Sequence, residues 1–395
     1  MVGKITRFTD CHILRNHQIY EDDIWFSDGV ILNPEKEFYV NKHIPHETIS
    51  LNGAIVAPGF IDLQINGGFG IDFTHDLIKN PEGLDVVAKG ILAHGVTSFC
   101  PTIITSKPEL YHKILPLLKS KVGGPQGAKI LGAHLEGPFI SPEKNGAHSL
   151  DDIQDLSNGV KTLKKVYKHI DAIRIVTLAP ERKNSLEVIN WLSKDRGINV
   201  SLGHSMADID IAAKAVKEGA NLITHLFNAM LPFHHRDPGL VGLLGLETEK
   251  PIYYGIIADG IHTHEATLKI AYKSHPKGVI LVTDAISAMG LEEGTHHIGQ
   301  KMIDIKQKSA YIAGTMTLCG SIATMNESVK YFKNAVGCTT AEALEAASLH
   351  PAEALRIQSH KGTLNYGTDA DFVVLNDELD VISTWIGGEM VYTNS

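Results

Sequence analysis

Eight runs of strand length, each almost wholly apolar, recur through the middle of the chain and constrain its fold more than any other feature. They cover residues 55–65, 97–104, 129–135, 173–178, 199–203, 221–224, 252–258 and 278–282. Helix-like stretches such as 208–218 and 265–273 separate several of them. Apolar strands that alternate with helices are typical of parallel strands buried on both faces. Eight such units over about 300 residues predict an α/β fold, a (β/α)8 barrel of the TIM type.

An open doubly wound sheet is the alternative architecture for alternating strands and helices. Such a sheet usually carries a glycine-rich phosphate loop after its first strand. The pattern G-x-G-x-x-G does not follow residue 65 in this sequence, which favours the barrel.

The two ends of the chain carry a different pattern, in which turn-forming residues separate short β-like runs. These runs are 11–14, 24–26 and 29–32 near the start, and 371–375 and 381–386 near the end. Neither end has enough strands to bury a core by itself. We therefore expect residues 1–57 and 360–395 to pair into one small β domain, and residues 58–359 to form the barrel domain.

Composition and charge exclude several classes of protein. The 36 Lys and Arg residues are outnumbered by 45 Asp and Glu, giving a formal charge of −9, whereas nucleic-acid binders usually show a basic surplus. No apolar run approaches the roughly 18 residues of a membrane span, and no signal-peptide core follows the charged N-terminus. The four cysteines lack C-x-x-C spacing. We expect a cytoplasmic protein that binds neither nucleic acid nor membranes.

Polar residues follow six of the eight runs, where the carboxyl ends of the barrel strands are expected. Active sites of such barrels are built at this end. Glu136, His204 and His225 lie there, and three such ligands with one open position are the pattern of a catalytic zinc site. A lone histidine there is more often a half-buried polar group, but residue type and position agree three times. His134 is expected to be either a partner of a metal ligand or a side chain of the barrel interior.

Asp284 follows the apolar run 279–282, where a buried carboxylate needs a partner. An activated water would be one, with the carboxylate acting as general base and then as general acid; the alternative role is a helix N-cap. Arg236, in a histidine-rich loop, is able to bind a phosphate or carboxylate with two hydrogen bonds. His148, His262 and the turn at 315–321 are further candidates for substrate contact, although each also fits an ordinary structural role.

Five motifs, in this order, resemble those of the N-acetylglucosamine-6-phosphate deacetylase family, a branch of the amidohydrolase superfamily. They are Pro58-Gly59-Phe60-Ile61-Asp62 with Gln64 and Asn66, His134-Leu135-Glu136-Gly137-Pro138-Phe139, Gly203-His204-Ser205, Thr224-His225-Leu226-Phe227-Asn228-Ala229-Met230 and Thr283-Asp284-Ala285. The resemblance spans the barrel and both terminal segments. It implies a metal-dependent barrel with a small β-sandwich built from both termini, a homodimer, and a small-molecule substrate, an N-acetylated amino-sugar 6-phosphate.

Carried over residue by residue, the resemblance makes Glu136, His204 and His225 the metal ligands and Asp284 the catalytic acid and base. The positions that it places around the sugar phosphate are Ala147, His148, Asn228, Ala229, Arg236, His262, Leu318, Cys319 and Gly320. In the family the arginine reaches the neighbouring subunit's active site, which implies the same for Arg236.

Gln64 and Asn66 stand where many amidohydrolases carry His-x-His for a second metal. Amides are poor ligands for such ions beside imidazole. One divalent ion per subunit is therefore expected, with zinc as the first choice and iron, cobalt or manganese as alternatives.

The reaction that the resemblance implies is hydrolysis of the acetamide to acetate and glucosamine 6-phosphate, in amino-sugar metabolism. Asp284 would take a proton from the attacking water and pass it to the departing amine, with His148 facing the oxyanion. Two alternatives stay open: another amidohydrolase of this fold, such as a cyclic amidase or a nucleobase deaminase, and a non-catalytic sugar-phosphate sensor.

Overall fold

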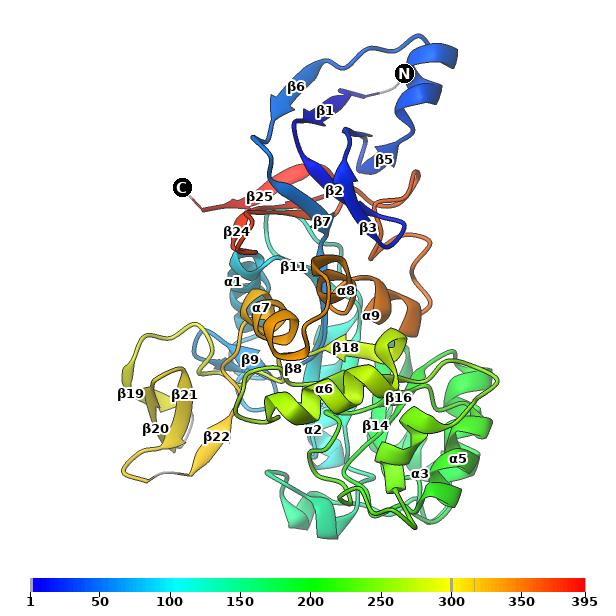
Figure 1. Ribbon diagram of the computed structural model, residues 1–395. Coiled ribbons are helices and arrows are strands. Elements are labelled where there is room, and N and C mark those ends of the chain that lie inside the picture. Colours follow the sequence, from blue (N-terminus) through cyan, green and yellow to red (C-terminus); the bar gives the residue numbers. More distant parts are fainter. Residues whose placement is uncertain (1–2, 299–300, 316, 395) are drawn as a thin grey trace.

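A parallel barrel forms the centre of the computed structural model, which describes residues 3–298, 301–315 and 317–394 (Figure 1). Each of the eight predicted runs supplies one of its strands. The strands are β8 (Phe60–Ile65), β11 (Val96–Ile104), β13 (Ala133–Glu136), β14 (Ile173–Leu178), β15 (Asn199–Leu202), β16 (Leu222–Ile223), β17 (Tyr253–Ile256) and β18 (Val279–Leu281), in that order around the barrel, with β12 (Lys129–Ile130) leading into β13. The predicted α/β barrel is confirmed.

The seam between the first and last strands is closed by individual hydrogen bonds rather than by a continuous ladder. At the carboxyl end, the amide of Asp284 donates to the carbonyl of Gln64 over 2.8 Å. Further down, the amides of Ile61 and Leu281 donate to the carbonyls of Ala347 and Ala346, which lie between the two strands. The first and last strand ends, which carry Gln64 and Asp284, are therefore held side by side.

Helices surround the barrel and bury their apolar faces against it. They are α1 (Gly83–Gly90), α2 (Pro108–Ile114), α3 (Val160–Tyr167), α4 (Ser185–Asn190), α5 (Ile209–Glu218), α6 (Glu265–Ser274), α7 (Met325–Val336), α8 (Thr340–Glu345) and α9 (Leu349–Ala354). The start of α5 is fixed by an N-cap residue in the sequence. The Asp208 carboxylate accepts a hydrogen bond from the amide of Ile211 at 2.8 Å. Its end at Gly219 uses a backbone φ of +122° that favours glycine.

The two ends of the chain meet in a β-sandwich above the barrel in the view of Figure 1. One sheet has the order β25 (Glu389–Thr393), β24 (Val381–Ile386), β23 (Phe372–Leu375), β7 (Ile55–Pro58), β2 (His12–Arg15) and β3 (Gln18–Glu21), and the other has β5 (Val30–Leu32), β4 (Ile24–Ser27), β1 (Thr6–Thr9) and β6 (Glu47–Ser50). Strand β7 joins the ends, pairing with β2 on one side and with β23 on the other. The rings of Phe8, Phe26 and Phe372 pack edge to face between the sheets, with centroids 5.0–5.6 Å apart.

A separate four-stranded sheet projects from the barrel between β18 and α7, at the lower left of Figure 1. Its strands are β19 (Gly294–Ile298), β20 (Lys301–Lys306), β21 (Ser309–Ile312) and β22 (Leu318–Gly320), all antiparallel, and a short hairpin of β9 (Gly67–Gly68) and β10 (Ile71–Asp72) follows β8. No pattern in the sequence predicts this sheet. The predicted turn at Leu318–Gly320 is wrong, because these residues pair with β21 as an edge strand. No described helix is both long and apolar enough for a membrane crossing.

Candidate metal centre and active site

Glu136, His204 and His225 converge at the carboxyl end of the barrel. Their ligand atoms all lie within 4.8 Å of one another, and the three residues are buried. Glu136 ends β13, His204 lies two residues after β15, and His225 lies two residues after β16. Residues 68 and 89 positions apart are therefore brought together by the parallel strand order. The backbones of both histidines are left-handed, with φ of 49° and 29°, a strain that folds retain mainly at functional sites.

The hydrogen-bonding pattern of this group indicates a site for a cation. The His204 Nδ1–H donates to the Lys144 carbonyl over 2.7 Å, so the neutral ring presents a lone pair at Nε2. That atom lies 3.1 Å from Oε1 of Glu136 and 3.0 Å from Nε2 of His225. His225 Nε2 is 3.0 Å from the same carboxylate oxygen. Three acceptor atoms at such distances repel one another unless a proton or a metal ion lies between them, and the His2Glu set suits a divalent ion.

Electrostatics agree with this interpretation. Burial opposes charge on Glu136, yet the two imidazoles of His204 and His225 beside it outweigh burial and hold the Glu136 pKa well below its usual value. Burial lowers the pKa of His225, but the hydrogen bond and charge of Glu136 reverse the effect and raise it to about 9. The pocket therefore stabilises positive charge at this point. His225 Nδ1 is buried and has no hydrogen-bond partner among the described residues.

Asp284 lies beside this group, held by two amide side chains. Asn66 Nδ2 donates to its Oδ1 over 2.7 Å, and Gln64 Nε2 donates to the same atom over 3.1 Å. Gln64 Nε2 also lies 3.0 Å from Oε1 of Glu136, so one amide joins the two carboxylates. Burial, followed by the charge of Glu136, raises the pKa of Asp284 to about 6. Asp284 has a left-handed backbone, with φ of 46°, and caps no helix.

His148, one of the predicted substrate contacts, lies against the metal group. Its ring centroid is 4.4 Å from that of His204, and its Nε2 is 3.8 Å from Oε2 of Glu136. The amide of Thr105 donates to its Nδ1 over 3.3 Å. Burial lowers the pKa of His148 to about 4, so the neutral ring carries its proton on Nε2, facing the site. Thr105, which follows β11, was missed in the sequence because its side chain is neither charged nor a metal ligand.

The other predicted contacts divide into those at the rim and those away from it. Asn228 has a buried Nδ2 with no partner among the described residues, ready for an incoming acceptor. Ala229 and His262 follow neighbouring strands at the same rim. Strand β22 reaches the rim where Ser321 bridges to Ala285, which places Cys319 and Gly320 nearby. Ala147 lines a separate cavity of about 530 Å³ with Thr105 and Lys107.

Two predicted residues are not brought to the centre. Arg236 is exposed, and its backbone amide donates to His234 Nδ1 over 3.4 Å. His134, considered as a partner of a metal ligand, uses both ring nitrogens elsewhere. Its Nδ1 bonds to the Leu63 carbonyl at 2.9 Å and its Nε2 to Thr177 Oγ1 at 2.7 Å. His134 is a barrel-interior side chain, as its alternative reading had it.

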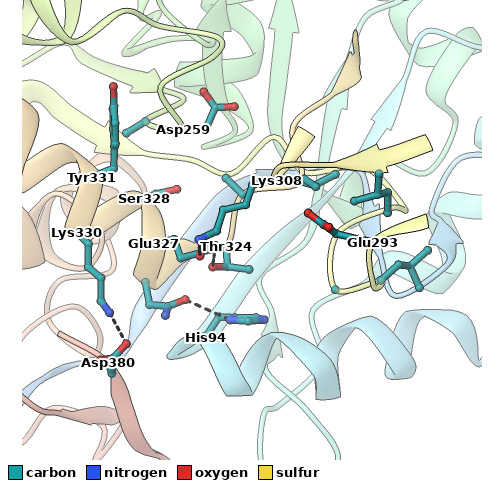
Figure 2. Close-up of a pocket in the computed structure, with 17 residues that line it drawn as sticks. His94, Asp259, Glu293, Lys308, Thr324, Glu327, Ser328, Lys330, Tyr331 and Asp380 are labelled. Carbon is teal, nitrogen blue, oxygen red and sulfur yellow. Dashed lines mark hydrogen bonds and ion pairs between the residues drawn. The ribbon is translucent and has the colours of Figure 1, made fainter. Parts of the chain in front are cut away.

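A larger cavity, of about 770 Å³, lies beside this centre, between α7 and the sheet β19–β22 (Figure 2). Asp259, from the loop after β17, lines it together with Tyr331 and Lys308. The metal group does not line this cavity, and the chemistry described above does not take place there.

Comparison with known proteins agrees with the geometry. The model of the amidohydrolase family matches residues 55–391. The N-acetylglucosamine-6-phosphate deacetylase of Danio rerio is 54% identical over 392 residues, covering 98% of this chain and 97% of the relative. The crystal structure of the Pasteurella multocida enzyme of that name has 30% identity and a TM-score of 0.85, with 99% and 100% of the two chains covered. A mutant of the Mycobacterium smegmatis enzyme, solved with N-acetyl-D-glucosamine-6-phosphate, has 27% identity and a TM-score of 0.83, with the same coverage.

Proposed function

Since this chain belongs to the amidohydrolase family, we propose that it hydrolyses the acetamide of N-acetyl-D-glucosamine 6-phosphate, releasing acetate and D-glucosamine 6-phosphate. One observation carries the proposal: three buried acceptor atoms, from Glu136, His204 and His225, meet beside the carboxylate of Asp284. That is the arrangement of a metal-assisted hydrolase with a built-in base. The relatives named above act on this sugar phosphate, which supports the choice of substrate.

Glu136, His204 and His225 would hold one divalent ion, with zinc as the first choice. A bound ion of this kind supplies Lewis-acid chemistry, polarising a carbonyl and making water more acidic. Gln64 and Asn66 stand where many amidohydrolases carry His-x-His for a second metal ion. Here the Gln64 amide lies 3.0 Å from a carboxylate oxygen of Glu136, and the Asn66 amide donates to the carboxylate of Asp284. Their amides therefore orient Asp284 and Glu136, which supports one ion per chain.

Asp284 moves the proton. Its carboxylate takes a proton from the water that attacks the acetamide carbon and delivers it to the sugar nitrogen as the C–N bond breaks. A pKa raised toward neutrality suits both halves of this task, because the group gives up its proton as readily as it takes one. His148 presents its Nε2–H to the oxyanion that forms on the acetyl group.

The phosphate end of the substrate would be bound by His262, Asn228 and an arginine from a second copy of the chain. Arg236 is exposed, and the same rim loops expose apolar side chains, among them Phe233 at 64% and Ile261 at 40%. Exposed apolar groups beside an exposed guanidinium suit a protein interface. We therefore propose a homodimer interface at these loops, in which Arg236 would contribute to the active site of the partner.

Two experiments test the proposal. Purified protein is analysed for bound metal, and acetate release from N-acetyl-D-glucosamine 6-phosphate is compared with ammonia release from nucleobases and with ring opening of cyclic amides. We expect about one divalent ion per chain and acetate release alone. Equal or faster ammonia release would favour the deaminase alternative, and tight binding without turnover in metal-loaded protein would favour the sensor.

Subunit mixing tests the shared site. Asp284→Asn and Arg236→Ala each damage a different part of it, so a mixed dimer contains one intact site if Arg236 acts on its partner. Random re-association of equal amounts should then recover about a quarter of the wild-type activity at low substrate concentration. If Arg236 acts within its own chain, mixing recovers nothing beyond the average of the two variants.

A further inference from the structure

The loop after β17 contains a buried carboxylate that the proposed chemistry does not use. Asp259 Oδ1 accepts from the amides of Ile261 at 2.9 Å and of His262 at 2.8 Å. Its Oδ2 lies 2.6 Å from Nδ1 of His262, and its side chain is only 7% exposed. One carboxylate thus fixes both the backbone of the loop and the orientation of the His262 ring.

The charges of this pair favour an imidazolium. Burial opposes charge on both partners, but their mutual hydrogen bond and attraction raise the pKa of His262 and lower that of Asp259. Two other ionisable groups act on His262: Asp284, after β18, raises its pKa, and His225, after β16, lowers it. On the other side of the loop, Tyr331 of α7 packs so closely that a Cβ on Gly260 would lie 2.9 Å from its hydroxyl.

Asp259 is one of several charged residues that line the 770 Å³ cavity (Figure 2). Lys308 pairs with Glu327, and Lys330 pairs with Asp380. Asp259 is paired with His262 instead, so its negative charge serves the imidazole at the rim of the active site. Because Nδ1 of His262 is bound to Asp259, Nε2 is the ring nitrogen that remains free to donate a hydrogen bond. Within the described ranges, Nε2 makes no hydrogen bond.

We propose that Asp259 is a positioning residue that holds the His262 ring by its Nδ1 and leaves the Nε2–H available to the 6-phosphate of the substrate. This inference rests on the proposed function, since the phosphate is the one permanently ionised group of that substrate. A charge-assisted hydrogen bond to phosphate is roughly twice as strong as a neutral one. Asp259 therefore contributes to recognition of the phosphorylated sugar without touching it.

The test is Asp259→Asn. Asparagine keeps an oxygen for the two backbone amides, so the loop stays in place, but it cannot hold the ring as an imidazolium. We expect KM for N-acetyl-D-glucosamine 6-phosphate to rise about tenfold while kcat changes less than about threefold. For unphosphorylated N-acetylglucosamine, kcat/KM should be unchanged. Asp171→Asn is the matched control, because Asp171 forms an exposed ion pair with Lys119 before β14, at the opposite end of the barrel.

Two readouts separate positioning from simple loss of structure. The pH at which KM for the phosphorylated sugar begins to rise should be lower in Asp259→Asn, since His262 loses its proton earlier. By NMR, the His262 ring, assigned by its disappearance in His262→Asn, should titrate at lower pH in Asp259→Asn and respond less to added inorganic phosphate. This readout needs no turnover, so it decides the proposal even if the wild-type protein fails to release acetate.

An unchanged His262 titration in Asp259→Asn overturns the proposal. So does an equal loss of kcat/KM on phosphorylated and unphosphorylated sugar, which would mark Asp259 as a purely structural residue. If the wild-type protein releases acetate but Asp259→Asn behaves like Asp171→Asn, the proposed function stands and this inference alone fails.

Discussion

Replacing Asp284 by asparagine should abolish proton transfer while leaving the metal group intact. The carboxylate receives hydrogen bonds from Asn66 and Gln64 on a single oxygen, Oδ1. Asparagine retains an acceptor for both donors and matches the volume of aspartate, so the surrounding structure should persist. What it lacks is a basic group for the attacking water and an acid for the leaving amine.

The size of the effect follows from that loss. General acid–base catalysis contributes typically 10²–10⁴-fold, and one carboxylate here serves both proton transfers. We therefore expect kcat to fall by about 10³-fold or more, equivalent to about 4 kcal/mol in the activation free energy. Metal content should stay at the wild-type value, because the three converging ligand atoms belong to Glu136, His204 and His225.

The pH dependence of kcat provides a second test of the role of Asp284. Burial, with the charge of Glu136, raises the pKa of Asp284 to about 6, and a bound cation nearby would lower it. The base is active when deprotonated, so wild-type kcat should rise with pH through a limb at or below about pH 6. That limb should be missing from the residual activity of Asp284→Asn.

The assay measures acetate release under saturating substrate, with elemental analysis of the same samples and Glu136→Gln as the variant expected to lose metal. A kcat for Asp284→Asn within tenfold of wild type would refute the assigned role. Loss of metal in parallel with activity would instead identify Asp284 as a ligand.

Three further predictions concern the metal and the fold. Dialysis against a chelator should abolish acetate release, and zinc, iron(II), cobalt or manganese should restore it to different extents; full activity in a metal-free sample would contradict the site. Lys361→Met should destabilise the protein by about 3–5 kcal/mol in urea unfolding, because Asp369 and the buried Asp371 lose the cation that pairs with both; adding Asp371→Asn should recover part of the loss. Phe372→Ala should cost about 3–5 kcal/mol by removing a ring shared by strands from both ends of the chain, and a near-neutral effect would mean that the two ends do not share a core.

The sequence alone was enough to predict the barrel strands and to single out the three residues that converge as a candidate metal group. Strands buried on both faces need near-continuous apolar residues, which makes runs such as 173–178 and 252–258 conspicuous. Polar residues at the ends of such runs, such as Glu136 and His225, stand out for the same reason. The sheet β19–β22 was missed because it lies outside the barrel, and its short strands lack such continuous apolar runs.

Only the tertiary structure decided how these residues face one another. Gln64 bridges Glu136 and Asp284, 72 and 220 positions away in the chain, and His134 turns into the barrel although it is next but one to a metal-binding candidate. Side-chain direction at a strand end depends on local backbone twist and on partners from other strands, neither of which has a local sequence pattern. The sequence thus selects which chemical groups reach the rim, while the closed circle of strands fixes their distances, their hydrogen bonds and their charge.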